Sequence, residues 1–256
     1  MKEFKKDSLT IKVFESRQLM GEAVAAAVSA CIKSLLSKQE FVSIIFGAAP
    51  SQNEFFAALL ENDVDWKRIN AFHMDEYVNL AADAPQGFGN FLKERLFDLA
   101  PFNSVNYING NASDEQKECL RYASLLQESK IDIVCLGIGE NTHLAFNDPH
   151  VADENDPYLV KRVDLDEACR TQQVNDGCFE QLTEVPTHAL TLTLPALLNA
   201  PYAFCTVPGE KKAKAVYHTL NEDISDDFPS SLLRKHQNAV LFLDQDSSEL
   251  IKPNIP

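Results

Sequence analysis

The sequence predicts an α/β fold: a single domain with a doubly wound, mostly parallel sheet and helices on both faces of that sheet. Short, continuous apolar runs such as 41–46 and 131–136 indicate strands that are buried on both sides. Stretches with apolar residues at helical spacing, such as 17–38 and 115–129, alternate with these strands, and this alternation is typical of a parallel sheet. No change in composition divides the chain, so we expect one domain over 1–256.

Capping residues mark the starts of several predicted helices. Ser16 and Asp114 can cap the two helices named above. Ser51 and Glu54 have the spacing of a capping box, which predicts the start of a third helix. The other strands are predicted at 11–14, 69–73, 105–108, 158–163, 188–194, 202–207 and 239–243. The other helices are predicted near 90–99, 166–173, 195–199 and 208–220, with a helical turn at 230–233 and a mobile acidic loop at 150–157.

The charge and composition exclude several classes of protein. A net charge of −15 repels phosphate backbones, so we expect no nucleic-acid partner. The sequence has no apolar run of the roughly 18 residues that a membrane span needs and no secretory signal, so we expect a cytoplasmic protein without a membrane partner. The six cysteines form no C-x-x-C pair, so we expect free thiols and no metal site. The sequence leaves room for a homo-oligomer.

The loop 137–149 has the strongest signs of chemistry. It follows the apolar strand 131–136 and so lies at the carboxyl end of a strand, where open α/β sheets bind their ligands. Two glycines allow a tight turn with the backbone close to a ligand. His143 can exchange a proton near neutral pH, and Asp148 follows five residues later. The alternative is a glycine-rich loop with a chance histidine.

Two other strand-to-helix junctions could bind an anion. In Gly47-Ala48-Ala49-Pro50-Ser51, small side chains leave backbone N–H groups accessible at the start of a helix, and the serine hydroxyl adds a donor. An ordinary turn before a capped helix is the alternative. Lys211 and Lys212 run against the dipole of the helix that they open, which predicts either a bound anion or a pair of solvated lysines.

Two carboxylates and an arginine complete the candidates. Asp75 and Glu76 follow the strand 69–73, where a partly desolvated carboxylate could act as a general base and a solvated turn is the alternative. Arg170 could clamp a phosphate or carboxylate, although a surface ion pair is commoner. Nearly all these candidates lie at strand carboxyl ends, so we expect them to converge in one pocket. Such a set suits proton transfer on a small phosphorylated substrate.

Four segments resemble one family. Met74-Asp75-Glu76-Tyr77 resembles the motif M-D-E-Y, 109–111 resembles N-G-N, and 137–149 is similar to G-x-G-x-D-G-H-I-A-F-N-E-P. The segment 209–213 lies where a phosphate-binding lysine is found, which aligns with Lys212. The chain thus resembles the glucosamine-6-phosphate deaminase/isomerase family, which also includes the 6-phosphogluconolactonases. It lacks the D-E-R and A-S-L-F-P segments of the lactonase branch, so the deaminase branch fits better.

The resemblance implies a reaction. Deaminases open the sugar ring, move a proton between C2 and C1, and release ammonia to leave fructose 6-phosphate, without a metal or organic cofactor. The roles that it implies are a base for the C2 proton (Asp75), a group that assists ring opening (His143), residues that orient the histidine (Asn141 and Asp148), and substrate-binding residues (Gly47, Ala48, Ala49, Ser51, Glu76, Arg170 and Lys212).

Several positions depart from the family pattern. The aspartate two residues before the histidine is Asn141, which can orient an imidazole but cannot stabilise its cation with a charge. The next position, usually glycine, is Thr142, which we expect to be strained if φ is positive there. The glutamate is Asp148, and the arginine near Cys178 is missing, with Arg170 as a candidate replacement. Two alternatives to a deaminase stay open: a 6-phosphogluconolactonase, in which the histidine activates water, and a non-catalytic sugar-phosphate sensor, which Asn141 favours.

Overall fold

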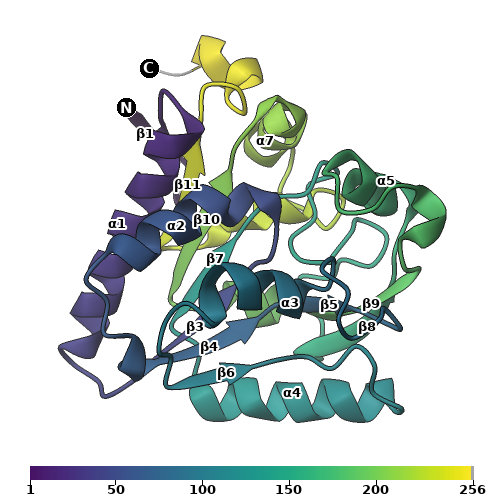
Figure 1. Ribbon diagram of the computed structural model, residues 1–256. Helices are drawn as coiled ribbons and strands as arrows, with labels where there is room; N and C mark the ends of the chain where they lie inside the picture. Colours follow the sequence, from purple (N-terminus) through teal and green to yellow (C-terminus); the bar gives the residue numbers. More distant parts are fainter. Residues whose placement is uncertain (255–256) are drawn as a thin grey trace.

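The computed structural model describes residues 1–254 and contains a large sheet, a small sheet and seven α-helices (Figure 1). The strands of the large sheet are β1 (Lys2–Lys6), β2 (Leu9–Val13), β3 (Val42–Phe46), β4 (Ile69–His73), β6 (Ser104–Asn106), β7 (Ile133–Leu136), β10 (Tyr202–Val207) and β11 (Ala239–Leu243). The small sheet contains β5 (Asp75–Tyr77), β8 (Val160–Asp164) and β9 (His188–Leu192). The helices are α1 (Arg17–Leu36), α2 (Asn53–Glu61), α3 (Phe88–Leu92), α4 (Glu115–Ser129), α5 (Glu167–Asn175), α6 (Leu194–Leu198) and α7 (Ala213–Asn221).

The large sheet has the order β1-β2-β11-β10-β7-β3-β4-β6, and every neighbouring pair except β1 and β2 is parallel. The predicted fold class is confirmed. Residues 255 and 256 of the predicted domain lie outside the described residues.

Successive side chains along the strands of the large sheet pack alternately into two apolar cores, one on each face. On β3, Val42, Ile44 and Phe46 pack into one core and Ile45 into the other, because successive strand residues point to opposite faces. The first core contains residues of α1, α2 and α3, and the second contains residues of α4, α6 and α7. Both faces of the sheet are therefore covered, which explains why its strands are continuously apolar.

The chain reverses its direction across the sheet between β3 and β7. From β3 it proceeds outward through β4 to β6, and then returns to β7 and proceeds the other way through β10 to β11. The loops that leave the carboxyl ends of β3 and β7 therefore separate and open a crevice, which is where sheets of this type bind ligands.

The small sheet was predicted only in part. A single residue, Met74, separates β4 from β5, and β5 pairs antiparallel with β9, which also pairs antiparallel with β8. Three residues are too few to show a strand period, so β5 is absent from the prediction. β1 is also absent from it, because the charges of Lys-Glu-Phe-Lys-Lys hide any apolar alternation; such charges are common on edge strands. Figure 1 shows β8 beside α4.

The predicted helix caps have mixed outcomes. Ser16 accepts a hydrogen bond from the N–H of Leu19, and Asp114 accepts one from Lys117, as predicted. The capping box is wrong: Ser51 lies in a 3-10 turn, Pro50–Gln52, and α2 begins after it without a side-chain cap. A π-helical turn, Lys93–Phe97, follows α3 within the predicted helix 90–99, and 3-10 turns are found at Trp66–Arg68, Leu182–Glu184, Glu210–Lys212, Pro229–Lys235 and Glu249–Asn254.

Helix α1 is more apolar than expected. Its length and composition meet those of a membrane span, so the statement that no segment does so is wrong. Its buried residues, among them Met20, Val24, Val28 and Ile32, pack against the strands in the core that it shares with α2. That packing is typical of a core helix.

Candidate active site

One cavity of about 790 Å³ lies at the carboxyl ends of β3, β4, β7 and β10. The predicted site residues that line it are Gly47, Ala48, Ala49, Ser51, Asp75, His143 and Lys212. The base, the histidine and the anion loop therefore share one pocket, as their positions at strand ends predict. Asn141 and Asp148 lie behind the histidine, whereas Glu76 and Arg170 do not line this cavity.

A tight loop after β7 brings His143 to the cavity. The N–H of Gly139 donates to the carbonyl of His143 at 2.9 Å, and the N–H of Thr142 donates to the carbonyl of Gly139 at 3.0 Å. A Cβ atom on Gly139 would lie 2.2 Å from ring atoms of His143, so only glycine leaves room for the imidazole. Thr142 has φ of 73°, which confirms the strain expected of a β-branched residue there.

Two acceptors fix the tautomer of His143. Its Nδ1 lies 2.7 Å from Oδ1 of Asn141 and 2.9 Å from Oδ1 of Asp148. The amide orientation of Asn141 is consistent, because its Oδ1 also accepts from the backbone N–H of His143 and its Nδ2 donates to Asp148 at 2.8 Å. In the neutral ring Nδ1 therefore carries the proton, and Nε2 is an acceptor that is free to act in the cavity.

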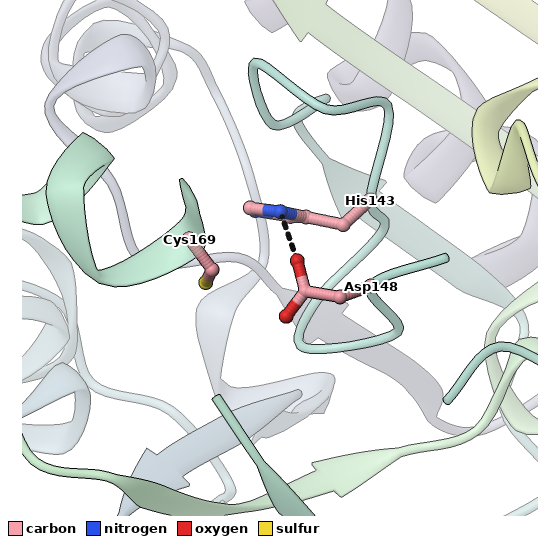
Figure 2. A group of neighbouring side chains, drawn as sticks. All are labelled: His143, Asp148 and Cys169. Atoms are coloured by element: carbon pink, nitrogen blue, oxygen red, sulfur yellow. Dashed lines mark ion pairs between the residues drawn. The ribbon is translucent and has the colours of Figure 1, made fainter. Parts of the chain in front are cut away.

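Asp148 is fully buried behind the imidazole (Figure 2). Burial alone would raise the pKa of Asp148, but the charge of His143 and the hydrogen bonds from His143 and Asn141 hold that pKa below its ordinary value. The carboxylate thus stays ionised and orients the ring. The thiol of Cys169, on α5, lies within 4.8 Å of the ligand atoms of both residues.

His143, Asp148 and Cys169 are the one group in residues 1–254 with three potential metal-ligand atoms this close together. Two properties make the group a poor metal site. The proton on Nδ1 of the histidine is already shared between two acceptors. Burial and the neighbouring Asp148 raise the pKa of Cys169, which keeps it a neutral thiol, whereas metals bind the thiolate.

Asp75 faces the cavity from β5. Its backbone pairs with that of Thr191, and its side chain is only 7% exposed. Burial, and then the charge of Glu76, raise the pKa of Asp75 well above its ordinary value. Its carboxylate has no hydrogen-bond partner among the described residues, so the cavity contains a desolvated group that can accept a proton strongly.

Glu76 points to the other side of β5 and has a structural role. Its carboxylate accepts hydrogen bonds from the backbone N–H groups of Tyr77 at 2.9 Å, Phe88 at 3.1 Å and Gly89 at 2.8 Å. It therefore ties β5 to the start of α3, where free N–H groups need acceptors. The expectation that Glu76 lines the substrate pocket is wrong.

The loop after β3 and Lys212 line the same cavity. Gly47 lies so close to Met74 and the carbonyl of Cys135 that a Cβ there would come within 3.1 Å of the methionine, which favours glycine. Lys212 is 9% exposed, and within residues 1–254 its ammonium has neither an ion pair nor a hydrogen-bond partner. Burial lowers the pKa of Lys212, whereas Asp176 and Glu140 oppose that change. An unpaired, nearly buried cation beside a helix N-terminus is suited to an anionic ligand.

Arg170 is not part of the cavity. Its guanidinium donates to the backbone carbonyls of Leu182 at 2.7 Å and Val185 at 2.8 Å, which fixes the segment after α5. The expectation that it replaces a missing substrate arginine, and the alternative of a surface ion pair, are both wrong.

Several cavity residues were missed by sequence reasoning. They include Arg17, Met74, Phe88, Arg95 and Gln173. Most lie on helices or after turns, whereas the predicted site residues follow the ends of strands. Arg17 alone had a usable signal, because a cation at the first position of α1 opposes the helix dipole in the same way as Lys211.

Comparison with known proteins identifies the family. Residues 15–242 match the family described as glucosamine-6-phosphate isomerases/6-phosphogluconolactonase. The glucosamine-6-phosphate deaminase of Bacillus cereus (strain B4264) is 34% identical over 229 residues, which cover 90% of this chain and 86% of that protein. The deaminase of Bacillus cytotoxicus is 32% identical over 242 residues, which cover 94% of this chain and 89% of that protein.

Solved structures agree with this result. A monomeric glucosamine-6-phosphate deaminase superposes with a TM-score of 0.85 at 25% identity, over 94% of this chain and 99% of that one. The 6-phosphogluconolactonase of Thermotoga maritima superposes with a TM-score of 0.76 at 20% identity, over 93% and 100%, and shows a shared fold. The chain belongs to the family of glucosamine-6-phosphate isomerases and 6-phosphogluconolactonases.

Proposed function

We propose that this protein deaminates an amino-sugar 6-phosphate, converting glucosamine 6-phosphate and water to fructose 6-phosphate and ammonia. The observation that carries the proposal is that Asp75, His143 and the anion site with Lys212 line one cavity. Relatives named glucosamine-6-phosphate deaminase support it, at 34% and 32% identity over most of the chain.

Each group has a step in the proposed reaction. Nε2 of His143 assists ring opening by moving the proton of the C1 hydroxyl to the ring oxygen. Asp75 then removes the proton from C2 of the open-chain sugar and returns a proton to C1, while the C1 carbonyl oxygen takes up a proton from the ammonium group of the substrate. The resulting C2 iminium takes up water, and ammonia leaves as the C2 carbonyl forms. Lys212 and the loop 47–51 hold the phosphate, so that C2 lies beside the carboxylate.

The environment of Asp75 suits this role. A base must be ionised to accept a proton, and a raised pKa makes the ionised form more basic. Activity should therefore rise with pH as Asp75 loses its proton. Asn141 and Asp148 hold the ring of His143 in a fixed orientation. The steps proposed for Asp75 and His143 require no metal or organic cofactor.

A lactonase is the second candidate. The oriented imidazole, with Nε2 free in the cavity, could activate water to attack 6-phosphogluconolactone. This reaction removes no carbon-bound proton and so does not need Asp75. A non-catalytic sugar-phosphate sensor would need only the anion site. The cytoplasmic location, a homo-oligomer, and the absence of nucleic-acid and membrane partners stay predictions.

The test is a turnover assay of purified protein with glucosamine 6-phosphate that follows ammonia and fructose 6-phosphate together. We expect both products in equal amounts from the wild type, a large loss in Asp75→Asn, and little change in Asp83→Asn, which removes an exposed carboxylate nearby in the sequence. Hydrolysis of 6-phosphogluconolactone that survives in Asp75→Asn would favour the lactonase. Stabilisation by sugar phosphates without turnover would favour the sensor.

A further inference from the structure

A π-helical turn directs Arg95 into the cavity. The turn Lys93–Phe97 continues α3, and the N–H of Asp98 reaches the carbonyl of Lys93 at 3.0 Å, one residue further than in an α-helix. Such turns are rare and are often found at functional sites. Within this turn Leu96 and Phe97 are buried in the core, whereas the side chain of Arg95 lines the same cavity as Asp75 and His143.

Mostly neutral contacts hold the guanidinium of Arg95 in place. Its Nε donates to Oδ1 of Asn53 at 3.0 Å, and its Cζ lies 4.5 Å from the centre of the Phe91 ring. Its one carboxylate partner, Glu94, is 71% exposed, and an ion pair so accessible to water neutralises little charge. Nη2 has no partner within residues 1–254. The group is thus oriented but still available to an anion.

The charged groups of Arg17 and Lys211, which also line the cavity, already have partners within the protein. Arg17 is paired with Glu54 at 2.7 Å, and Lys211 donates to the carbonyl of Asn175 at 2.8 Å. Lys212 has no hydrogen-bond or ion-pair partner among the described residues, and Nη2 of Arg95 has none either. With a net charge of −15 on the whole chain, an anionic substrate needs such local cations.

Arg95 and Lys212 both lie near residues 176–178, which follow α5. Asn53, which holds Arg95, is the first residue of α2 and follows the anion loop 47–51 directly. The charge of Asp176, at the end of α5, raises the pKa of Lys212. The charges of Asp176 and Arg95 shift the pKa of Cys178 in opposite directions, so both lie near that thiol. Arg95 thus contacts the start of α2, and both Arg95 and Lys212 line the cavity near residues 176–178.

We propose that Arg95 is a substrate-binding residue that, together with Lys212 and the loop 47–51, holds the phosphate group of the substrate. The inference rests on the proposed function for the identity of the substrate, but phosphate binding can be measured without turnover. The planar guanidinium can donate two parallel hydrogen bonds to phosphate oxygens, which a single lysine cannot do. Arg95 thereby supplies the arginine that was sought in Arg170.

The test compares Arg95→Met, Arg95→Lys and a matched control, Lys93→Met. Lys93 is an exposed cation of the same π-helical turn and does not line this cavity, so its loss changes the net charge equally. Inorganic phosphate is titrated by calorimetry. Loss of one charge-assisted contact should weaken phosphate binding at least about tenfold in Arg95→Met, less in Arg95→Lys, and under about twofold in the control.

Turnover provides a second readout. In Arg95→Met the KM for glucosamine 6-phosphate should rise about tenfold or more while kcat changes less, because the phosphate is bound in both ground and transition states. Equal phosphate affinity in wild type, Arg95→Met and Lys93→Met would overturn the inference. A wild type that binds phosphate through Arg95 but turns over no amino sugar would overturn the proposed function and leave this inference intact.

Discussion

Asp75→Asn should remove activity and increase stability. The substitution keeps the shape of the side chain and deletes its charge. Wild-type Asp75 is 7% exposed and has no hydrogen-bond partner in residues 1–254, so its ionised form is held in a poorly solvated place. A general base contributes about 10²- to 10⁴-fold to a rate, and we expect kcat to fall by that range.

The stability effect has a defined pH dependence. Because folding raises the pKa of Asp75, the wild type has its full stability below the ordinary pKa of the carboxyl and loses stability as pH rises through the folded pKa. The asparagine variant does not lose stability in this way. Its free energy of unfolding should equal that of the wild type in acid and should exceed it by about 1–3 kcal/mol near neutral pH, the usual cost of an unsatisfied buried polar group. Each kcal/mol raises Tm by about 2–4 °C in a chain of this size.

The assay is thermal unfolding of wild type, Asp75→Asn and the control Asp83→Asn at a series of pH values, with turnover measured on the same samples. The reasoning is refuted if Asp75→Asn keeps wild-type kcat. It is also refuted if the variant melts below the wild type at neutral pH, because the carboxylate would then stabilise the fold.

Three further substitutions test the rest of the site. Gly139→Ala should reduce kcat about 100-fold with a near-normal fold, because the new methyl group must displace the imidazole of His143; unchanged kcat would contradict the observed packing. Asp148→Asn should lower both kcat and neutral-pH stability, and its stability deficit should disappear as pH falls through the lowered pKa of Asp148; a deficit that persists in acid would point to packing instead. Glu76→Gln should cost about 1–2 kcal/mol in the free energy of unfolding by chemical denaturation, since one amide oxygen replaces a carboxylate that accepts three N–H bonds. A Glu76→Gln variant with wild-type stability and a strongly raised KM would show instead that Glu76 binds the substrate.

The sequence was sufficient to predict which loops line the cavity, because strand ends have a strong pattern. Apolar runs that end in glycine or acidic residues predicted the loops after β3, β4 and β7, and a parallel sheet brings such loops together. The family resemblance predicted strain at Thr142, because the family usually has glycine at that position, and its φ of 73° agrees.

Side-chain direction was harder to predict. Asp75 and Glu76 are adjacent and chemically similar, and only the alternation of β5 sends one to the cavity and the other to the start of α3. A three-residue strand leaves no period in the sequence. Arg95 was missed for a similar reason, because a π-helical turn has no sequence signature and rotates the residue away from the face that an α-helix would give it. The role of Arg170 was predicted wrongly because its partners are backbone carbonyls. Every residue has one, so the sequence gives no sign of which carbonyls an arginine will contact.

The most direct test of proton transfer uses glucosamine 6-phosphate deuterated at C2, with the products followed by NMR. The account predicts equal amounts of fructose 6-phosphate and ammonia, with the deuterium found at C1 or in water, and a rate that falls about 100-fold or more in Asp75→Asn. Ammonia released without ketose, or an Asp75→Asn variant that transfers the deuterium as fast as the wild type, would contradict it.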